Sequence, residues 1–457
     1  MKKTIGIFSS VIMATSLLAG PVVQAEGNLP NDKNEFTYID EVELNDTFSS
    51  ANQTLSNEVI IHGTFSESDK DYYKLEVTGE GYRDLSIFIG QLDGKRTEMK
   101  MDIALYNSDK EEIHPYQSVE ASDGQFIIKP GTYYVKAQDL TNINNGERYD
   151  LLAYVTEVPE GSLFIREGSD RYETAARIAM QSRANGYAEN IVLASGEDFP
   201  DALSGAPLAY HLDAELLLTQ KDKLPKSTEQ ALKDFKTKNV TIIGGTGAIS
   251  EEVENYLETK LDINVDRISG KDRYATAAAV AAELPQSDKA VVAYGKNFPD
   301  ALSISPYAAK NKMPILLTET NSVPEATEEA LKSYKETIAV GGTGVISEDV
   351  LEDLPTAERL SGKNRYSTSV AITEYFDWER PAANIATGAG YADALSGSLF
   401  SAKLGAPLLL TTKNHLDPST KEYLENNHKY KYNLLGGEGA ISSSVYDDVI
   451  DLIIAKK

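Results

Sequence analysis

Residues 199–204 read Phe-Pro-Asp-Ala-Leu-Ser, and this stretch returns as Phe-Pro-Asp-Ala-Leu-Ser at 298–303 and as Tyr-Ala-Asp-Ala-Leu-Ser at 391–396. Two further motifs recur in the same order, with a period of about 100 residues. The first is an Asp/Asn-Arg-Tyr triplet, found as Asp170-Arg171-Tyr172, Asp272-Arg273-Tyr274 and Asn364-Arg365-Tyr366. The second is a Gly-Gly-x-Gly turn, which begins at Gly244, Gly341 and Gly436. Three independent markers with one period indicate three copies of one unit, each long enough to bury its own core.

Within each copy, predicted strands alternate with predicted helices. In the first copy, continuous apolar runs at 190–194, 215–219 and 240–243 are separated by amphipathic helical patterns. Continuous apolar strands between helices are typical of a parallel sheet that is covered on both faces. The sequence therefore predicts an α/β protein with three tandem parallel-sheet modules.

The predicted repeats span 161–261, 262–356 and 357–457. The chain ends after the last helix of the third copy. We therefore expect the strand at 163–165 to take the strand position that Arg267-Ile268 and Arg359-Leu360 take in the other copies. All three copies are then complete.

Residues 26–160 have a different pattern. Short runs at 71–77, 84–89, 101–106 and 132–137 alternate apolar and polar residues and are bounded by Gly, Asp, Asn and Pro. This pattern predicts a small antiparallel β-sandwich or jelly roll in which one face of each sheet is exposed to solvent. In Tyr72-Tyr73 and Tyr133-Tyr134, one ring of each pair should lie in the core and the other on the surface, because neighbours in a strand alternate faces.

The first 25 residues predict a secretory signal. Lys2 and Lys3 precede an uncharged segment with an apolar stretch from Ile5 to Ala19, and Val23-Gln24-Ala25 is a small-residue cleavage site. No later stretch approaches the roughly 20 apolar residues that cross a bilayer. We expect a secreted protein, with no membrane association after signal cleavage.

Composition excludes several functional classes. A net charge of −26 argues against nucleic acid as a partner. The absence of cysteine excludes disulfides, thiolate zinc sites and Cys nucleophiles. No His recurs beside the repeated Asp and Ser, as a Ser-His-Asp arrangement would require. We therefore predict a protein without catalytic residues or cofactor, apart from the calcium considered below.

The three repeats resemble the cell wall-binding repeat 2 family of Gram-positive surface proteins. The resemblance rests on the arginine motif, the Pro-Asp-Ala-Leu-Ser block, the apolar triplets at 216–218, 315–317 and 408–410, and the Gly-Gly-x-Gly turns. The first copy departs from the pattern at Ile165, which stands where the others have Arg, and the third has Tyr391-Ala392 for Phe-Pro. The resemblance implies Rossmann-like or Toprim-like modules around a pseudo-threefold axis and non-covalent attachment to an anionic secondary wall polymer.

The segment at 26–160 resembles the bacterial pre-peptidase C-terminal domain, a small β-sandwich that usually accompanies secreted enzymes. The matching residues are Glu41-Val-Glu-Leu-Asn-Asp46, Gly63-Thr64, Asp69-Lys-Asp-Tyr-Tyr73 and Pro130-Gly-Thr-Tyr-Tyr134.

The recurring polar residues are the candidate polymer-binding site. A guanidinium matches phosphate or carboxylate in a bidentate manner, and three equivalent sites would add avidity. The alternative is that each Arg forms an ion pair with the Asp of the Asp-Ala-Leu-Ser block and thereby fixes a module. The candidates are Arg171, Arg273 and Arg365, Asp201, Asp300 and Asp393, and Ser204, Ser303 and Ser396.

Two other features have both structural and functional interpretations. The Gly-Gly-x-Gly turns either cradle an anion with backbone N–H groups or form tight strand-to-helix connections. The turns lack the spacing, the lysine and the ribose-binding acid of nucleotide sites. The three apolar triplets are buried strands by periodicity, although the family resemblance implicates this block in polymer attachment.

Acidic and amide side chains in the N-terminal segment are candidate calcium ligands, because Ca²⁺ prefers oxygen ligands and some relatives of the accessory domain bind calcium here. The alternative is a solvated acidic loop. The candidates are Glu41, Glu43, Asn45, Asp46, Asp69 and Asp71.

These patterns together predict a secreted, non-catalytic protein of the cell wall that grips a secondary polymer or a peptidoglycan-associated glycan. One alternative is a wall hydrolase or a modifier of one. The other is a soluble accessory protein that binds a secreted partner through the β-sandwich.

Overall fold

The structure is a computed structural model. The structure describes residues 37–41, 45–51, 54–55, 59–65, 70–79, 83–90, 100–113, 123–141, 148–157, 162–183, 187–376, 378, 382–427 and 431–454. The predicted signal segment and the candidate ligands Glu43 and Asp69 lie outside these ranges. The chain divides into two compact units, Met1–Pro159 with Gln181–Gly186 and Glu160–Met180 with Tyr187–Lys457. Within the described ranges, every helix is too short or too polar to cross a bilayer.

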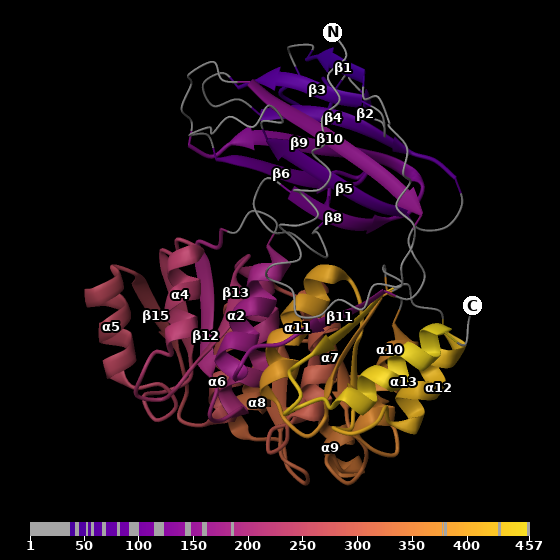
Figure 1. Cartoon of the computed structure of the whole chain (residues 1–457). Helices are drawn as coiled ribbons and strands as arrows, with labels where there is room; N and C mark the ends of the chain where they lie inside the picture. Colours follow the sequence, from indigo (N-terminus) through magenta and orange to yellow (C-terminus); the bar gives the residue numbers. More distant parts are fainter. Residues whose placement is uncertain are drawn as a thin grey trace. The chain divides into compact units, whose positions relative to one another are not determined.

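Between residues 37 and 157 of the first unit, the described elements are all strands, which form two five-stranded sheets (Figure 1). One sheet has the order β1-β3-β10-β5-β8 and the other has the order β2-β4-β9-β6-β7. The pairs β1–β3 and β2–β4 are parallel and the others are antiparallel. The strands are β1 (Thr37–Asp40), β2 (Thr54–Leu55), β3 (Val59–Thr64), β4 (Lys70–Val77), β5 (Arg83–Gly90), β6 (Met101–Tyr106), β7 (Glu112–Ile113), β8 (Asp123–Ile128), β9 (Gly131–Asp139) and β10 (Arg148–Glu157).

Alternation along the strands builds the core between the two sheets. Strand β4 buries every second residue, so that Tyr73 is fully buried and Tyr72 is only half-buried. Tyr133 and Tyr134 in β9 show the same division. The predicted β-sandwich and the division of each tyrosine pair between core and surface are therefore confirmed.

The second unit contains three four-stranded parallel sheets. Sheet one has the order β13-β12-β14-β15, sheet two β17-β16-β18-β19 and sheet three β21-β20-β22-β11. The strands are β11 (Ser162–Arg166), β12 (Asn190–Ser195), β13 (Glu215–Thr219), β14 (Asn239–Ile243), β15 (Asn264–Ile268), β16 (Lys289–Tyr294), β17 (Ile315–Thr318), β18 (Glu336–Val340), β19 (Ala357–Leu360), β20 (Ala382–Thr387), β21 (Leu408–Thr411) and β22 (Lys431–Leu435).

Helices connect these strands. They are α2 (Arg171–Ser182), the 3-10 helix η1 (Pro200–Ser204), α3 (Gly205–His211), α4 (Lys226–Asp234), α5 (Glu251–Leu261), α6 (Arg273–Ala282), α7 (Pro299–Lys310), α8 (Glu325–Leu331), α9 (Glu348–Asp353), α10 (Arg365–Tyr375), α11 (Ala392–Leu404), α12 (Pro418–Asn426) and α13 (Ser443–Ile454). The parallel α/β architecture predicted from the sequence is confirmed.

Each sheet takes its edge strand from the start of another sequence repeat. Strand β15 pairs with β14, and β19 pairs with β18, although both strands lie beyond the predicted repeat boundaries. Strand β11, which opens the first repeat, pairs with β22 of the third. Its register sets Ile165 opposite Leu434, as Arg267 stands opposite Ile242.

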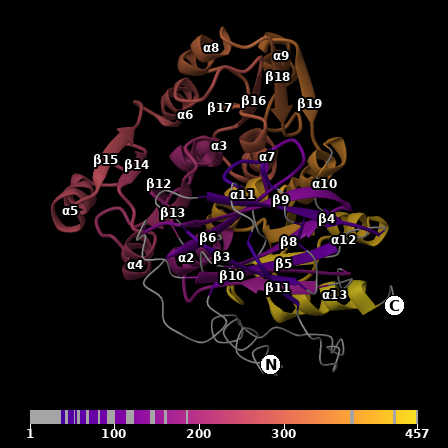
Figure 2. The same cartoon turned by 90° about the horizontal axis from the view of Figure 1, so that it is seen from above.

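Helices α3, α7 and α11 pack against one another between the three sheets (Figure 2). The sequence predicts one continuous helix from Pro200 to Tyr210, but its first turn is the 3-10 helix η1. The first copy is the only one that has both Gly and Pro at these positions, as Gly205 and Pro207. Because Pro207 has no N–H to donate to the Leu203 carbonyl, the α-helical hydrogen bond is missing at the first turn. The spacing of Ser227 and Gln230 also predicts an N-cap at Ser227, but this is wrong, because Pro225 takes the extended N-cap position before α4.

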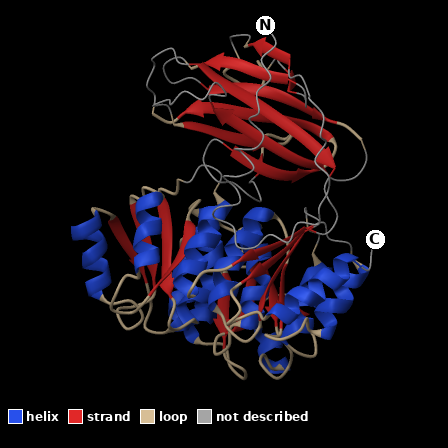
Figure 3. Cartoon of the chain, in the orientation of Figure 1, coloured by secondary structure: helices blue, strands red, loops and turns tan. Residues whose placement is uncertain are grey.

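The two faces of each sheet are covered by different helices (Figure 3). In sheet one, Leu193 and Ile242 belong to a core cluster that includes residues of α2, α4 and α5. On the opposite face, Leu216 and Ile243 lie against Gly205 of α3. Both faces are buried, which explains why the strands are apolar without alternation.

Candidate functional site

The three repeated arginines occupy the first position of a helix that follows an edge strand. In the second copy, the Asp272 side chain caps α6 by accepting hydrogen bonds from the N–H groups of Tyr274 and Ala275, and Tyr274 is buried. Arg273 is therefore placed at the helix start, where it reaches toward the next sheet. Each arginine donates to the carbonyl of the glycine after a central strand. The contacts are Arg171 to Gly196 (2.5 Å), Arg273 to Gly295 (2.8 Å) and Arg365 to Gly388 (2.5 Å).

The three repeated aspartates lie in the first turn of η1, α7 and α11. Each packs against the first glycine of a Gly-Gly-x-Gly turn. In sheet two, Asp300 Oδ2 lies 2.9 Å from the place where a Cβ on Gly341 would stand, and Gly341 has a φ of +125°. A side chain is excluded there twice, by conformation and by the carboxylate. Asp201 with Gly244 and Asp393 with Gly436 repeat this contact.

Burial raises the pKa of these carboxyl groups. The pKa of Asp300 rises to about 6, and that of Asp393 also rises to about 6. The pKa of Asp201 is raised by burial as well, against a hydrogen bond from Thr276 that lowers it. In each case the charge of one arginine opposes the shift. The pairs are Arg365 with Asp300, Arg171 with Asp393 and Arg273 with Asp201.

None of these three pairs forms a salt bridge in the described part of the chain. Each arginine is near an aspartate at one sheet and donates to a glycine carbonyl at another, so it lies between two sheets. Arg365, for example, lies near Asp300 at sheet two and donates to the Gly388 carbonyl at sheet three. Aspartates, glycine turns and arginines all follow the carboxyl ends of parallel strands, which is where open α/β sheets bind ligands.

An aromatic cluster joins the three sites. The residue two positions before each Asp is Phe199, Phe298 or Tyr391, and the three half-buried rings contact one another at centroid distances of 5.5, 5.7 and 6.1 Å. Arg365 lies 5.8 Å from the Phe298 ring centroid, and Arg171 lies 5.8 Å from that of Tyr391. Sequence reasoning did not assign these rings to the site, although an aromatic residue in one slot of all three copies was a signal for them.

The repeated serines are directed inward. Ser204, Ser303 and Ser396 are each at least 97% buried. Ser303 Oγ donates to the Pro299 carbonyl (2.8 Å), and Ser396 Oγ donates to the Ala392 carbonyl (3.0 Å). Their hydroxyl groups are thus occupied by the helices that carry them. The apolar triplets lie in β13, β17 and β21, all of whose residues are buried, as the periodicity predicted.

The structure brings three of the six candidate calcium ligands together in the β-sandwich. Asn45 and Asp71 are fully buried. Glu41 Oε1 accepts hydrogen bonds from Asn45 Nδ2 (3.1 Å), Tyr73 OH (2.5 Å) and Tyr149 OH (3.0 Å), and Tyr149 OH also lies 2.7 Å from Asp71 Oδ2. Asp46 is exposed. No group of three or more acidic or His side chains within metal-binding reach occurs among the described residues. Calcium binding stays a prediction.

Comparison with known proteins identifies relatives of this chain. The family model of cell wall binding domain 2 matches residues 166–254, 267–351 and 359–446. N-acetylmuramoyl-L-alanine amidase LytC of Bacillus subtilis (strain 168) is 35% identical over 308 residues, which cover 67% of this chain and 62% of the relative. The amidase enhancer of the same organism is 32% identical over 287 residues, which cover 62% of this chain and 39% of the relative. The chain thus spans less than two thirds of either relative.

Two solved structures share the fold. Cwp6 from Clostridium difficile has a TM-score of 0.64 at 21% identity and covers 86% of this chain and 68% of its own. Cwp8 from Clostridium difficile has a TM-score of 0.59 at 24% identity and covers 78% of this chain and 63% of its own.

Proposed function

The chain belongs to the cell wall binding domain 2 family, and from this premise we propose that it is a secreted, non-catalytic protein that holds an anionic secondary wall polymer through its three repeats. Cell wall association follows from the family. The observation that supports the polymer as ligand is the threefold recurrence of one site. A guanidinium, a carboxylate, an aromatic ring and a glycine turn meet at the carboxyl ends of each sheet.

We propose that the three modules are Rossmann-like or Toprim-like and are related by a pseudo-threefold axis. The identical strand order of the three sheets and the mutual packing of α3, α7 and α11 support this arrangement. Equivalent sites around one axis suit a repetitive polymer, because several repeating units then bind at once and avidity exceeds the affinity of a single site.

The attraction to the polymer has to be local. The chain carries a net charge of −26, so long-range electrostatics repel an anionic ligand. Arg171 and Arg365, which lie against rings of the aromatic cluster, supply positive charge where the polymer would lie. Because the carboxyl pKa of Asp300 and Asp393 is about 6, mildly acidic conditions neutralise two nearby negative charges and favour the same ligand.

Sedimentation with isolated cell walls tests this function. The mature chain from residue 26 is expected to sediment with intact walls and to stay in solution with walls from which the secondary polymer has been extracted. Equal binding to both preparations would show that the polymer is not the ligand. Absence of binding to intact walls would contradict wall attachment altogether.

A second candidate is a modifier of a wall hydrolase, which the similarity to the amidase enhancer favours. Under this hypothesis the chain itself releases no soluble wall fragments but changes the rate at which an added amidase does so. Turbidity loss of a wall suspension, measured with amidase alone and with amidase plus this chain, separates the modifier from a passive binder. Wall solubilisation by the chain alone would instead identify a hydrolase.

For the first unit we propose a calcium ion near Glu41, Asn45 and Asp71. The residues fit such an ion in part, because two carboxylates share a buried cluster and Asn45 Oδ1 accepts no hydrogen bond from any described residue. A bound cation would compensate the buried negative charge.

A further inference from the structure

Four glycines in the first two Gly-Gly-x-Gly turns are not required by the fold. They are the second and fourth residues of each turn, Gly245 and Gly247 before α5 and Gly342 and Gly344 before α9. An added Cβ at any of these positions would meet nothing within 4 Å. None of them has a positive φ. We call these four residues the open glycines.

The first residue of each turn makes the contrast clear. Gly244 and Gly341 have φ values of +112° and +125°, and an Asp carboxylate lies within 2.9 Å of the Cβ position. The remainder of the first turn is closed by a hydrogen bond from Ala248 N–H to the Gly245 carbonyl (2.9 Å). With negative φ at Thr246 and Gly247, this is a type I-like turn, which accommodates most residues. The fold explains the first glycine and leaves the open glycines unexplained.

The main chain of these turns is available for binding. In the first turn, the N–H groups of residues 245, 246 and 247 donate to no described residue, and the same holds for residues 342, 343 and 344 in the second. The third and fourth residues of both turns are exposed. Successive backbone N–H groups in a turn can form a concavity suited to an anion.

The two turns belong to the composite site described above. Gly244 and Gly341 touch Asp201 and Asp300, and those carboxylates face Arg273 and Arg365. The pKa of Asp300 is about 6, and its carboxylate forms no hydrogen bond with a described residue, so it remains able to accept one from a hydroxyl group. Backbone N–H groups that can donate to an anion, a carboxylate that can accept from a hydroxyl group and an aromatic ring are thus grouped. An acidic or phosphate-bearing sugar requires such a combination.

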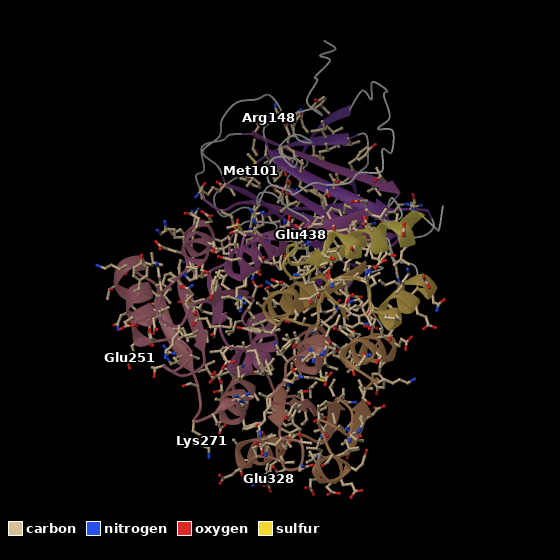
Figure 4. The ribbon with its side chains drawn as sticks, turned by 60° about the horizontal axis from the view of Figure 1, so that its bottom comes forward. Met101, Arg148, Glu251, Lys271, Glu328 and Glu438 are labelled. Atoms are coloured by element: carbon tan, nitrogen blue, oxygen red, sulfur yellow. The ribbon has the colours of Figure 1, made fainter. Side chains whose placement is uncertain are left out.

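We propose that the ligand leaves no room for side chains at the open glycines. An anionic group of the wall polymer lies directly against the main chain of the first two turns and accepts hydrogen bonds from their N–H groups. This inference rests on the proposed polymer-binding function. The third turn has an open position too, because an added Cβ at Gly439 would meet nothing within 4 Å, but Glu438 (labelled in Figure 4) is exposed at its centre and Glu167 Oε2 lies 3.1 Å from the Cβ position of Gly437. These carboxylates repel an anion, so the inference is confined to the first and second turns.

The double variant Gly247→Ala/Gly344→Ala tests the proposal in the full mature chain. Its circular dichroism and thermal midpoint are expected to match the unmodified protein, whereas its affinity for intact walls falls at least about tenfold because two methyl groups displace the polymer from the turns. Gly131→Ala in the β-sandwich is the matched control, since its Cβ has ordinary contacts beyond 3.6 Å, and its wall affinity should not change.

Each outcome decides between explanations. Normal wall binding by a folded double variant overturns the inference but leaves the proposed function standing, and loss of the fold shows that the open glycines are structural. Failure of the unmodified protein to bind walls removes both proposals. Glycerol phosphate and glucuronate, added at equal concentration as competitors, distinguish phosphate from carboxylate as the bound group. Competition by neither contradicts an anion site at these turns.

Discussion

Replacing Asp300 by Asn separates a ligand-binding carboxylate from one that stabilises the fold. In the folded protein, burial raises the pKa of Asp300 from 3.8 to about 6, and Arg365 only partly opposes this shift. The charged carboxylate therefore destabilises the folded state above pH 6. A shift of this size corresponds to roughly 3 kcal/mol at 1.36 kcal/mol per pKa unit.

The sign follows from proton uptake. Between pH 3.8 and about 6, the folded state binds a proton that the unfolded state has released, so stability increases as the pH falls. The gain is complete below pH 3.8 and is lost as the pH rises through 6. Asn carries no charge and keeps the shape of the side chain against Gly341. We expect Asp300→Asn to raise the thermal midpoint of the second unit by about 6 °C at pH 7.5 and to change it little at pH 4.

Scanning calorimetry of the full mature chain at the two pH values measures this difference. Asp393→Asn should behave like Asp300→Asn, because the pKa of Asp393 is also about 6. Asp222→Asn, at an exposed site, should have no effect at either pH. A lower midpoint for Asp300→Asn at pH 7.5 would refute the reasoning, because it would show that Arg365 holds the carboxylate as a stabilising ion pair.

Three further predictions concern other parts of the molecule. Gly341→Ala should destabilise the second unit by about 2 kcal/mol or more, seen in chemical denaturation, because φ is +125° and atoms of Val345 and Asp300 lie 2.6 and 2.9 Å from the Cβ position; an unchanged midpoint would contradict the turn geometry. Arg365→Gln should weaken wall binding about tenfold, with a smaller salt dependence, whereas Arg177→Gln, which removes an exposed pair with Glu173, should not; equal effects would mean that general charge and not the site binds the wall. Calcium at a hundredfold excess over its Kd should stabilise the first unit by about 2.7 kcal/mol, and Asn45→Leu should abolish that gain; a gain that survives would place the ion elsewhere.

The repeat made much of the second unit predictable. Each period carried apolar runs too short for a helix and too continuous for a half-exposed strand, so the parallel sheets followed from local pattern. The same recurrence placed Asp201 and Gly244 after neighbouring strands, which is why both were recognisable as site candidates. The edge position of the strand at 163–165 also followed, because the chain contained one opening strand and one vacant slot.

Contacts between copies were not predictable in the same way. Nothing local to Arg273 indicates that it approaches Asp201 of the first copy, since this approach depends on how α6 of the second copy packs against η1 of the first. The aromatic cluster has the same origin. Recurrence also does not distinguish ligand binding from packing. Ser303 recurs as faithfully as Asp300, yet its hydroxyl group is buried against the Pro299 carbonyl while the carboxylate lies at the turn.

The strands and arginines that the copies exchange show why one copy alone does not form a complete site. Each sheet is completed by a strand from beyond its own repeat, and the helix after that strand delivers an arginine to the glycine carbonyl of another sheet. Strand β11 closes this arrangement by joining the start of the first repeat to the third. A single repeat would therefore contain an Asp and a glycine turn but lack both its edge strand and the arginine that follows it. The site is a property of the contacts between copies, so the multivalent surface that we propose for a repetitive polymer would be built by the same contacts that fold the unit.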